Sequence, residues 1–271
     1  MSISALNSEA ARLLAYFQGA ESSIESRLNT AIQTVGTPGK QYFVDAIAGN
    51  DANAGAYSTP FLTIDKALSV IDGMDGRIVD LYLAQGNDPV QPVYTINAQY
   101  ELHNCDIQIK TYTPAGRTTT PILLQGAGQA NAALDMKGLW LHHSACVVIG
   151  IDVKTAETKV EGTTTSGMFR VRNYGAMSAV IFRTVGLTLG EAPAITTRRG
   201  FVHAGLDDVT VTRPTGTAQV LDIGSGGVAS LSVLTATIPG GSAWKDDLVT
   251  GILRFSNGTP RNLLSNLDFS V

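Results

Sequence analysis

Short runs of alternating polar and apolar residues recur along most of the chain, and they constrain its fold more than any other feature. Each run starts with a small or polar residue and continues apolar, polar, apolar, as expected for a strand with one buried face. The runs are 106–109, 138–141, 150–153, 186–189, 208–211, 230–233 and 266–269. The step from Val209 to Leu231 is about one rung of a β-solenoid, and wider steps leave room for loops. We therefore expect a mainly β fold of stacked rungs; a β-sandwich is the alternative, because it also contains short alternating strands.

The composition fits short strands and tight turns better than long exposed helices. The chain has 271 residues, of which 44% are hydrophobic, 15% are charged and 28 are glycine. This is enough apolar material for a sizeable core. A net charge of −4 without a basic run gives little support for nucleic acid or an anionic membrane as a partner.

Cysteine usage and hydropathy bear on the compartment. Cys105 and Cys146 are isolated and have no CxxC spacing, so neither a disulfide nor a zinc site is expected. No apolar run reaches membrane-spanning length, and the N-terminus lacks the order of charged and apolar residues found in a signal peptide. We expect synthesis in a cytoplasm, without export by a signal peptide or membrane insertion.

The first part of the chain carries a heptad-like apolar stripe. Its members recur in steps of three and four, the coiled-coil period. They are Ile3, Leu6, Ala10, Leu13, Phe17, Ala20, Ile24 and Leu28. We expect residues 1–39 to form a helical coiled-coil stalk or attachment segment, which ends at 36–39, and residues 40–271 to form the β domain. The alternative is an amphipathic helix that folds back on its own domain. The stripe does not fix the number of chains.

A second, shorter helix is expected between two strands, 42–45 and 78–83. Thr63 stands at the N-cap position, and the apolar residues after it fall at helical spacing. The proposed cap residues are Thr63, Ile64, Ala67, Leu68 and Ile71. A helix with one apolar face at this point can cover the open end of a sheet, which would otherwise expose unpaired edges and core.

The loop before this helix is rich in Gly, Asn and Asp. Its spacing Asp51-x-Asn53-x-Gly55 begins like a calcium-binding EF-hand loop, but Ala56 and Leu62 occupy the positions that need glycine and glutamate. Turns that use Asx side chains explain the composition better.

The residues from Tyr42 to Gly86 resemble the opening signature of right-handed parallel β-helix proteins of the pectate-lyase-like superfamily, to which many phage tailspikes and tail fibres belong. The matching positions are Tyr42 to Asp45, Gly49 to Asp51, Asn53, Gly55, Ser58 to Phe61, Thr63, Ile64 and Lys66 to Leu68. The resemblance implies a right-handed parallel β-helix whose N-terminal end is capped by the short helix. A stalk directly before the signature resembles phage fibres, which implies a homotrimer. The resemblance is specific for a fold and much less so for an activity.

Catalytic motifs are weak. Glycan hydrolysis needs two carboxylates across a bond, but Asp207-Asp208 and Asp246-Asp247 are sequence neighbours, whose side chains point to opposite faces of a strand. Arg198-Arg199 is the only basic doublet and has no acidic cluster near it in the sequence.

Histidine and tryptophan give equally weak signals. If 139–141 is a strand, one of His142 and His143 faces inward and the other outward, and their spacing does not favour a metal site. Trp140 and Trp244 could stack on sugars but are expected to pack in the interior.

These observations favour a structural virion protein of a bacteriophage, a homotrimeric tail fibre or tailspike-like subunit. Its N-terminal helices would attach it to other virion proteins, and its exposed loops would bind a host-surface polysaccharide. We expect no enzymatic activity, no cofactor and no catalytic or metal-binding residues. The alternatives are a polysaccharide-degrading depolymerase, either a hydrolase or a lyase, a capsid decoration or head-fibre protein, and a cellular binding module.

Overall fold

The computed structural model describes residues 39–86, 91–127, 137–156, 167–171, 176–214, 218–224, 226–245 and 247–269. The predicted coiled-coil stripe lies outside these residues. Its members are Ile3, Leu6, Ala10, Leu13, Phe17, Ala20, Ile24 and Leu28. Within the described ranges, no helix combines the length and hydropathy of a membrane span.

The larger sheet contains eleven strands. Eight of them follow one another across the sheet: β1 (Lys40–Val44), β2 (Ile78–Ala84), β5 (Asp106–Tyr112), β8 (Ala145–Ile149), β11 (Met177–Thr188), β13 (Phe201–Thr212), β15 (Val228–Thr237) and β17 (Leu263–Ser265). Off this path lie β3 (Val93–Ile96), β6 (Leu123–Gly126) and β9 (Asp152–Lys154), where β6 pairs with both β3 and β9, and β9 also pairs with β11.

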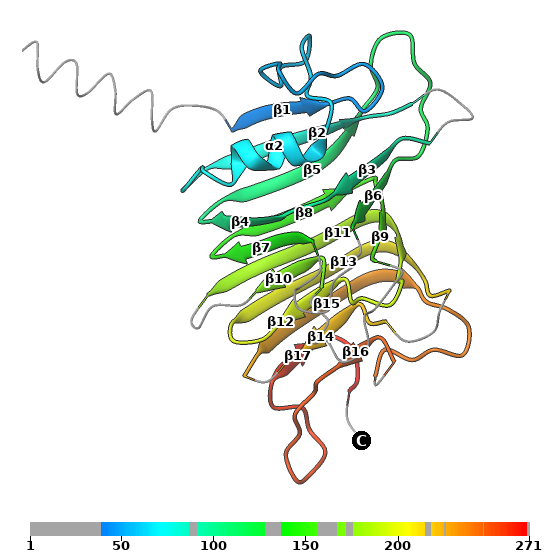
Figure 1. The fold of residues 1–271 in the computed structure, drawn as a ribbon. Coiled ribbons are helices and arrows are strands. Elements are labelled where there is room, and N and C mark those ends of the chain that lie inside the picture. The colour runs from blue at the N-terminus through cyan, green and yellow to red at the C-terminus, as the bar shows by residue number, and fades with distance from the viewer. Residues whose placement is uncertain are drawn as a thin grey trace, which may run out of the picture. The chain divides into compact units, whose positions relative to one another are not determined.

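The smaller sheet contains six strands. In spatial order they are β4 (Gln99–His103), β7 (Gly138–His142), β10 (Phe169–Val171), β12 (Ile195–Thr197), β14 (Leu221–Ile223) and β16 (Val249–Thr250). From β10 onward, successive strands belong alternately to the smaller and the larger sheet (Figure 1). Each passage of the chain, meaning one strand in the smaller sheet and the next in the larger, therefore extends both sheets by one strand.

The strand pairs in both sheets are parallel. Met177 pairs with Phe201, and Phe201 pairs with Val228, as successive passages of the chain stack in register. The expected mainly β organisation is therefore present. The β-sandwich alternative is wrong, because such a sandwich is built from antiparallel sheets joined by hairpins and Greek-key connections.

Left-handed backbone conformations stack at two corners of the fold. Asn104 and His143 follow the paired residues at the ends of β4 and β7, and their φ angles are 48° and 53°. Gly150, Thr184 and Asp208 follow the paired residues Ile149, Arg183 and Asp207, and have φ angles of 65°, 52° and 55°. Positive φ turns the chain sharply, so each column bends successive strands in the same direction.

The core lies between the sheets and consists of the alternate inward residues of every strand. Phe169 of β10 and Phe182 of β11 meet there edge to face, with ring centroids 5.5 Å apart, and both are fully buried. Cys105 and Cys146 are free thiols in the same core.

Helix α2 (Ile64–Ile71) buries Ile64, Ala67, Leu68 and Ile71 in this core and contacts β3 and β4. Thr63 is its N-cap, and the Thr63 hydroxyl accepts a hydrogen bond from the Lys66 amide. The edge strand β4 donates its Glu101 amide to the Asp72 carboxylate, at 2.7 Å. The helix therefore covers apolar core and also satisfies a backbone group on the sheet edge.

Two details of the expected strand pattern are wrong. Residues 266–269 do not form a strand; the last strand is β17, which ends at Ser265. Val209 pairs with Ala236, and Leu231 pairs with Ala204, so the step from Val209 to Leu231 does not join paired positions.

Candidate functional site

Four aromatic rings gather on the outer surface of the larger sheet, near its first strands. We call Phe43, Tyr57, Tyr82 and Tyr112 the aromatic platform. Phe43 and Tyr82 are stacked, with centroids 4.9 Å apart and planes at 10°. Tyr112 and Tyr57 meet Phe43 edge to face at 5.2 Å and 5.4 Å, and they are 5.8 Å from each other.

The alternation of the strands places these rings outside the core. On β2, Leu81 and Leu83 are buried, so Tyr82 between them points outward. By the same alternation, Tyr112 lies on the face of β5 opposite the buried Ile107 and Ile109, and Phe43 lies on the face of β1 opposite the buried Val44. None of the four rings belongs to the hydrophobic core cluster.

Tyr57 comes from the Gly- and Asn-rich loop and is 58% exposed. The loop is held by Asp51, whose Oδ1 accepts hydrogen bonds from the amides of Leu62 and Thr63 and whose Oδ2 accepts one from the Thr63 hydroxyl. Both oxygens of this carboxylate are engaged within the protein, which agrees with a turn and not with a calcium loop. These hydrogen bonds hold the loop that carries Tyr57 against the start of the helix.

A charged pair borders the platform. Lys110 Nζ lies 2.8 Å from Asp80 Oδ1 and 5.7 Å from the centroid of the Tyr82 ring. Burial raises the pKa of Tyr112 to about 12, helped by the negative charge of Asp45. Tyr112 is therefore a neutral phenol at physiological pH and can donate as well as accept a hydrogen bond.

Partly exposed aromatic rings beside charged hydrogen-bonding groups suit a ligand with both apolar and polar faces. A pyranose ring has this character: its C–H groups pack on aromatic faces while its hydroxyls bond to polar groups at the rim. The platform combines both kinds of group on a sheet surface.

The outer face of the smaller sheet presents a different set of groups. Trp140 on β7 stacks with the Arg170 guanidinium of β10, 4.7 Å from the ring, and Glu101 on β4 is its register partner on the other side. Trp140 and Arg170 are 7% and 4% exposed, so this indole is not an open surface for sugar.

The described members of the two acidic doublets, Asp207, Asp208 and Asp247, have structural positions. Asp207 Oδ2 lies 4.0 Å from Arg183 Nε, while Asp208 is a left-handed corner residue. Asp247 accepts a hydrogen bond from the Ala243 amide, and Asp246 lies outside the described residues. Arg198 and Arg199 follow β12 of the smaller sheet, whereas Phe43, Tyr82 and Tyr112 lie on strands of the larger sheet.

The histidine doublet separates as the strand ends. His142 is on the outer face of β7, where it is buried, and His143 forms the left-handed corner that follows. Neither of them points into the core between the sheets, so the expectation of one inward side chain is wrong. Trp244 packs partly buried against the core.

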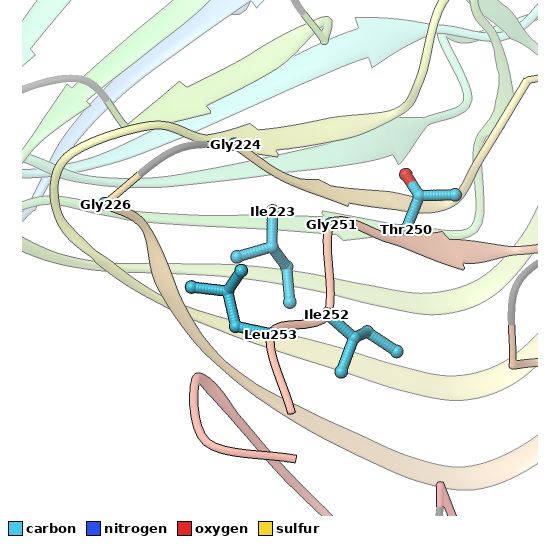
Figure 2. Close-up of a pocket in the computed structure, with 7 residues that line it drawn as sticks. All are labelled: Ile223, Gly224, Gly226, Thr250, Gly251, Ile252 and Leu253. Carbon is cyan, nitrogen blue, oxygen red and sulfur yellow. The ribbon is translucent and has the colours of Figure 1, made fainter. Parts of the chain in front are cut away.

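A pocket lies near the C-terminal end of the body (Figure 2). Its walls are Ile223, Gly224, Gly226, Thr250, Gly251, Ile252 and Leu253. The described lining residues carry no titratable side chain, so none of them offers a side-chain acid or base.

Sequence reasoning did not single out Phe43, Tyr57, Tyr82 or Tyr112 as a group. A usable signal existed for two of them, because Tyr82 and Tyr112 occupy positions of their strands where a polar residue is expected. The clustering itself depends on the pairing of β2 with β5, which joins residues distant in sequence.

No family model matches the chain, and no curated protein matches it. Two solved structures resemble it, both of a GH136 lacto-N-biosidase from Eubacterium ramulus. The native protein has a TM-score of 0.28 and 16% identity over 85% of this chain and 40% of that chain. The selenomethionine derivative has a TM-score of 0.31 and 15% identity over 84% and 47%. The chain spans less than half the length of these proteins.

Both of these structures are of an enzyme. This finding contradicts the expectation that the chain is not an enzyme. TM-scores this low give no argument for a particular reaction, substrate or catalytic residue in this chain.

Proposed function

We propose that the chain is a carbohydrate-active protein that engages a polysaccharide on the aromatic platform. The observation that carries the proposal is the contact of Phe43, Tyr57, Tyr82 and Tyr112 with one another on the outer sheet surface instead of in the core. A cluster of aromatic rings on the surface of a protein often marks a binding site, and the faces of such rings can stack on sugars.

The groups around the rings support a polar ligand. Lys110 and Asp80 offer charged donors and acceptors beside Tyr82, and the phenols of Tyr57 and Tyr112 offer two more groups. Each sugar contributes little binding free energy on such an open surface. An extended or repeated glycan, which makes several contacts at once, is therefore a better ligand than a monosaccharide.

We also propose that the two parallel sheets belong to a right-handed parallel β-helix capped by α2. Support comes from the signature in residues 42–86 and from the alternation of the chain between the two sheets.

The heptad-like stripe of the N-terminal segment, directly before a signature that resembles phage fibres, supports a further proposal, a homotrimeric phage fibre or tailspike-like protein on the virion surface. In this form the N-terminal helices attach the trimer to other virion proteins, and several platforms bind one polysaccharide with added avidity. Light scattering on the full chain and on a Leu13→Asp, Phe17→Asp variant tests the oligomer: a trimer that dissociates supports it, and a monomeric full chain contradicts it.

The carbohydrate proposal is tested with a panel of purified bacterial surface polysaccharides, immobilised and probed with the full chain. Tyr57→Ala is the key variant because Tyr57 is exposed and contributes to no core packing. We expect it to weaken binding by more than about 1 kcal/mol, as truncation of a contact residue that carries binding energy does. Release of reducing ends, measured on the same samples, detects cleavage.

Phe255→Ala is the matched control. Phe255 is 57% exposed, close to the 58% of Tyr57, and contacts Arg261 near the other end of the body. Polysaccharide binding that Tyr57→Ala leaves intact, or that Phe255→Ala reduces equally, would exclude the platform as the site.

A further inference from the structure

We propose that Glu101, His103 and His142 form a binding site for a divalent transition metal ion of the zinc type, on the outer face of the smaller sheet. The site goes beyond the proposed function, because none of its residues belongs to the aromatic platform.

The strand register brings the three side chains together. His103 of β4 and His142 of β7 are direct partners on neighbouring parallel strands, and their rings are stacked with centroids 4.4 Å apart and planes at 4°. Glu101 is two residues before His103 on the same strand, so both side chains lie on one face.

The Glu101 carboxylate lies near the Nε2 atoms of both imidazoles. Glu101 Oε2 is 3.5 Å from His103 Nε2 and 3.6 Å from His142 Nε2, and the three possible ligand atoms all lie within 4.8 Å of one another. Both N···O separations exceed the roughly 2.7–2.9 Å of a charge-assisted hydrogen bond.

These separations are close to those that a metal ion requires. Zinc bonds to nitrogen and carboxylate oxygen are about 2.0–2.2 Å long, so two ligands of a tetrahedral ion are roughly 3.3 Å apart. The two N···O distances need almost no adjustment. The stacked rings must tilt toward each other, and His103 has the freedom to do so because half of its side chain is exposed.

The donor set selects the class of metal. Two imidazoles and one carboxylate suit zinc and its neighbours, whereas calcium and magnesium prefer oxygen ligands only. Three protein ligands leave a fourth position, and the exposure of Glu101 and His103 gives water access to it.

His142 forms the buried side of the cluster, because its side chain is 7% exposed, against 50% for His103 and 45% for Glu101. Metal binding requires the imidazoles to be neutral. On the neighbouring strand β10, Arg170 is stacked on Trp140.

The test is zinc binding by the full chain, expressed without a histidine tag and stripped of metal by a chelator. Isothermal titration with Zn²⁺ is expected to give one site per chain, and Co²⁺ is expected to give the visible absorption of a four-coordinate ion. His103→Ala and Glu101→Gln change exposed side chains and should remain folded by circular dichroism. Each should weaken zinc binding by more than the roughly 10- to 100-fold that loss of an outer-shell partner costs.

His203→Ala is the matched control, because His203 lies on the outer face of the larger sheet beside Ser230. It should leave zinc affinity and stoichiometry unchanged. A full chain that binds no stoichiometric zinc, or zinc binding that His103→Ala and Glu101→Gln leave intact, overturns the proposal. Polysaccharide binding is measured without zinc, so its outcome does not depend on this site.

Discussion

Asp45 and Arg117 form a two-pronged ion pair, with Arg117 Nη2 2.7 Å from Asp45 Oδ2 and Nη1 2.9 Å from Oδ1. The pair joins the end of β1 to the loop after β5, and Arg117 also donates to the Gln85 carbonyl after β2. Both side chains are largely buried, at 11% exposure for Arg117 and 5% for Asp45. This pair ties three chain segments together, and its charges act on Tyr112 of the aromatic platform.

Arg117→Ala is expected to lower the free energy of unfolding by about 3–5 kcal/mol, since it leaves a buried carboxylate without its partner. Urea denaturation followed by fluorescence measures the change. Arg183→Ala is the control, because the exposed pair of Arg183 and Asp207 should contribute at most about 1 kcal/mol. Equal effects of the two substitutions would contradict the role given to Arg117.

The same pair predicts an acid dependence of stability. Burial acts to raise the pKa of Asp45, but hydrogen bonds from Arg117 and from the amides of Ile47 and Ala48, with the charge of Arg117, outweigh it and lower the pKa. A carboxyl whose pKa is lower in the folded state stabilises the protein above its unfolded pKa of about 3.9, and this contribution is lost as the pH falls through the folded value. The difference in unfolding free energy between wild type and Asp45→Asn should therefore shrink from pH 6 to pH 3. A constant difference would show that the carboxylate charge does not stabilise the fold.

Thr184 is a β-branched residue with a φ of 52°. It occupies the same position along the sheet as Gly150, just after β8, and Asp208, within β13. An L-residue in this region costs about 1–2 kcal/mol, and glycine avoids the cost. We expect Thr184→Gly to raise the melting temperature. Thr210→Gly, at an exposed strand position, should lower stability by about 0.5–1 kcal/mol. A loss of stability in Thr184→Gly would mean that the Thr184 side chain contributes more than the strain costs.

Leu68 of α2 is fully buried, and truncation to alanine should cost about 2–5 kcal/mol. Leu62, just before the helix, is 39% exposed, and Leu62→Ala should cost less than about 1 kcal/mol. Thermal unfolding of both variants tests whether the helix is part of the same cooperative unit as the sheets. A Leu68→Ala variant whose main transition is unchanged would separate the helix from the core.

The faces of the strands are predictable from the sequence, whereas their partners are not. Alternation is a local signal, so the order of residues alone identifies Val79, Leu81 and Leu83 as inward. Register depends on the lengths of the loops between passages, and these lengths vary. For this reason the runs at 208–211 and 230–233 share one pattern in the sequence and yet are not paired residue for residue in the fold.

The candidate sites follow the same distinction. Thr63 and the apolar residues of α2 are close in sequence, so helical spacing reveals them. Glu101 and His142 come together only through the pairing of β4 with β7. The spacing of the histidines in the sequence does not predict this pairing. Convergence of this kind requires the register of the sheet.

Asp51 provides a last prediction, on the loop that carries Tyr57. Its carboxylate accepts two backbone amides and the Thr63 hydroxyl, so Asp51→Ala should cost about 1–3 kcal/mol by leaving charged-acceptor bonds unmade. Asp51→Asn keeps an oxygen for the two amides and should cost less. Addition of calcium or of a chelator should not change the melting temperature of the wild type, because both carboxylate oxygens already have partners. A melting temperature that rises with calcium and loses this response in Asp51→Ala would make the loop a cation site instead of a turn.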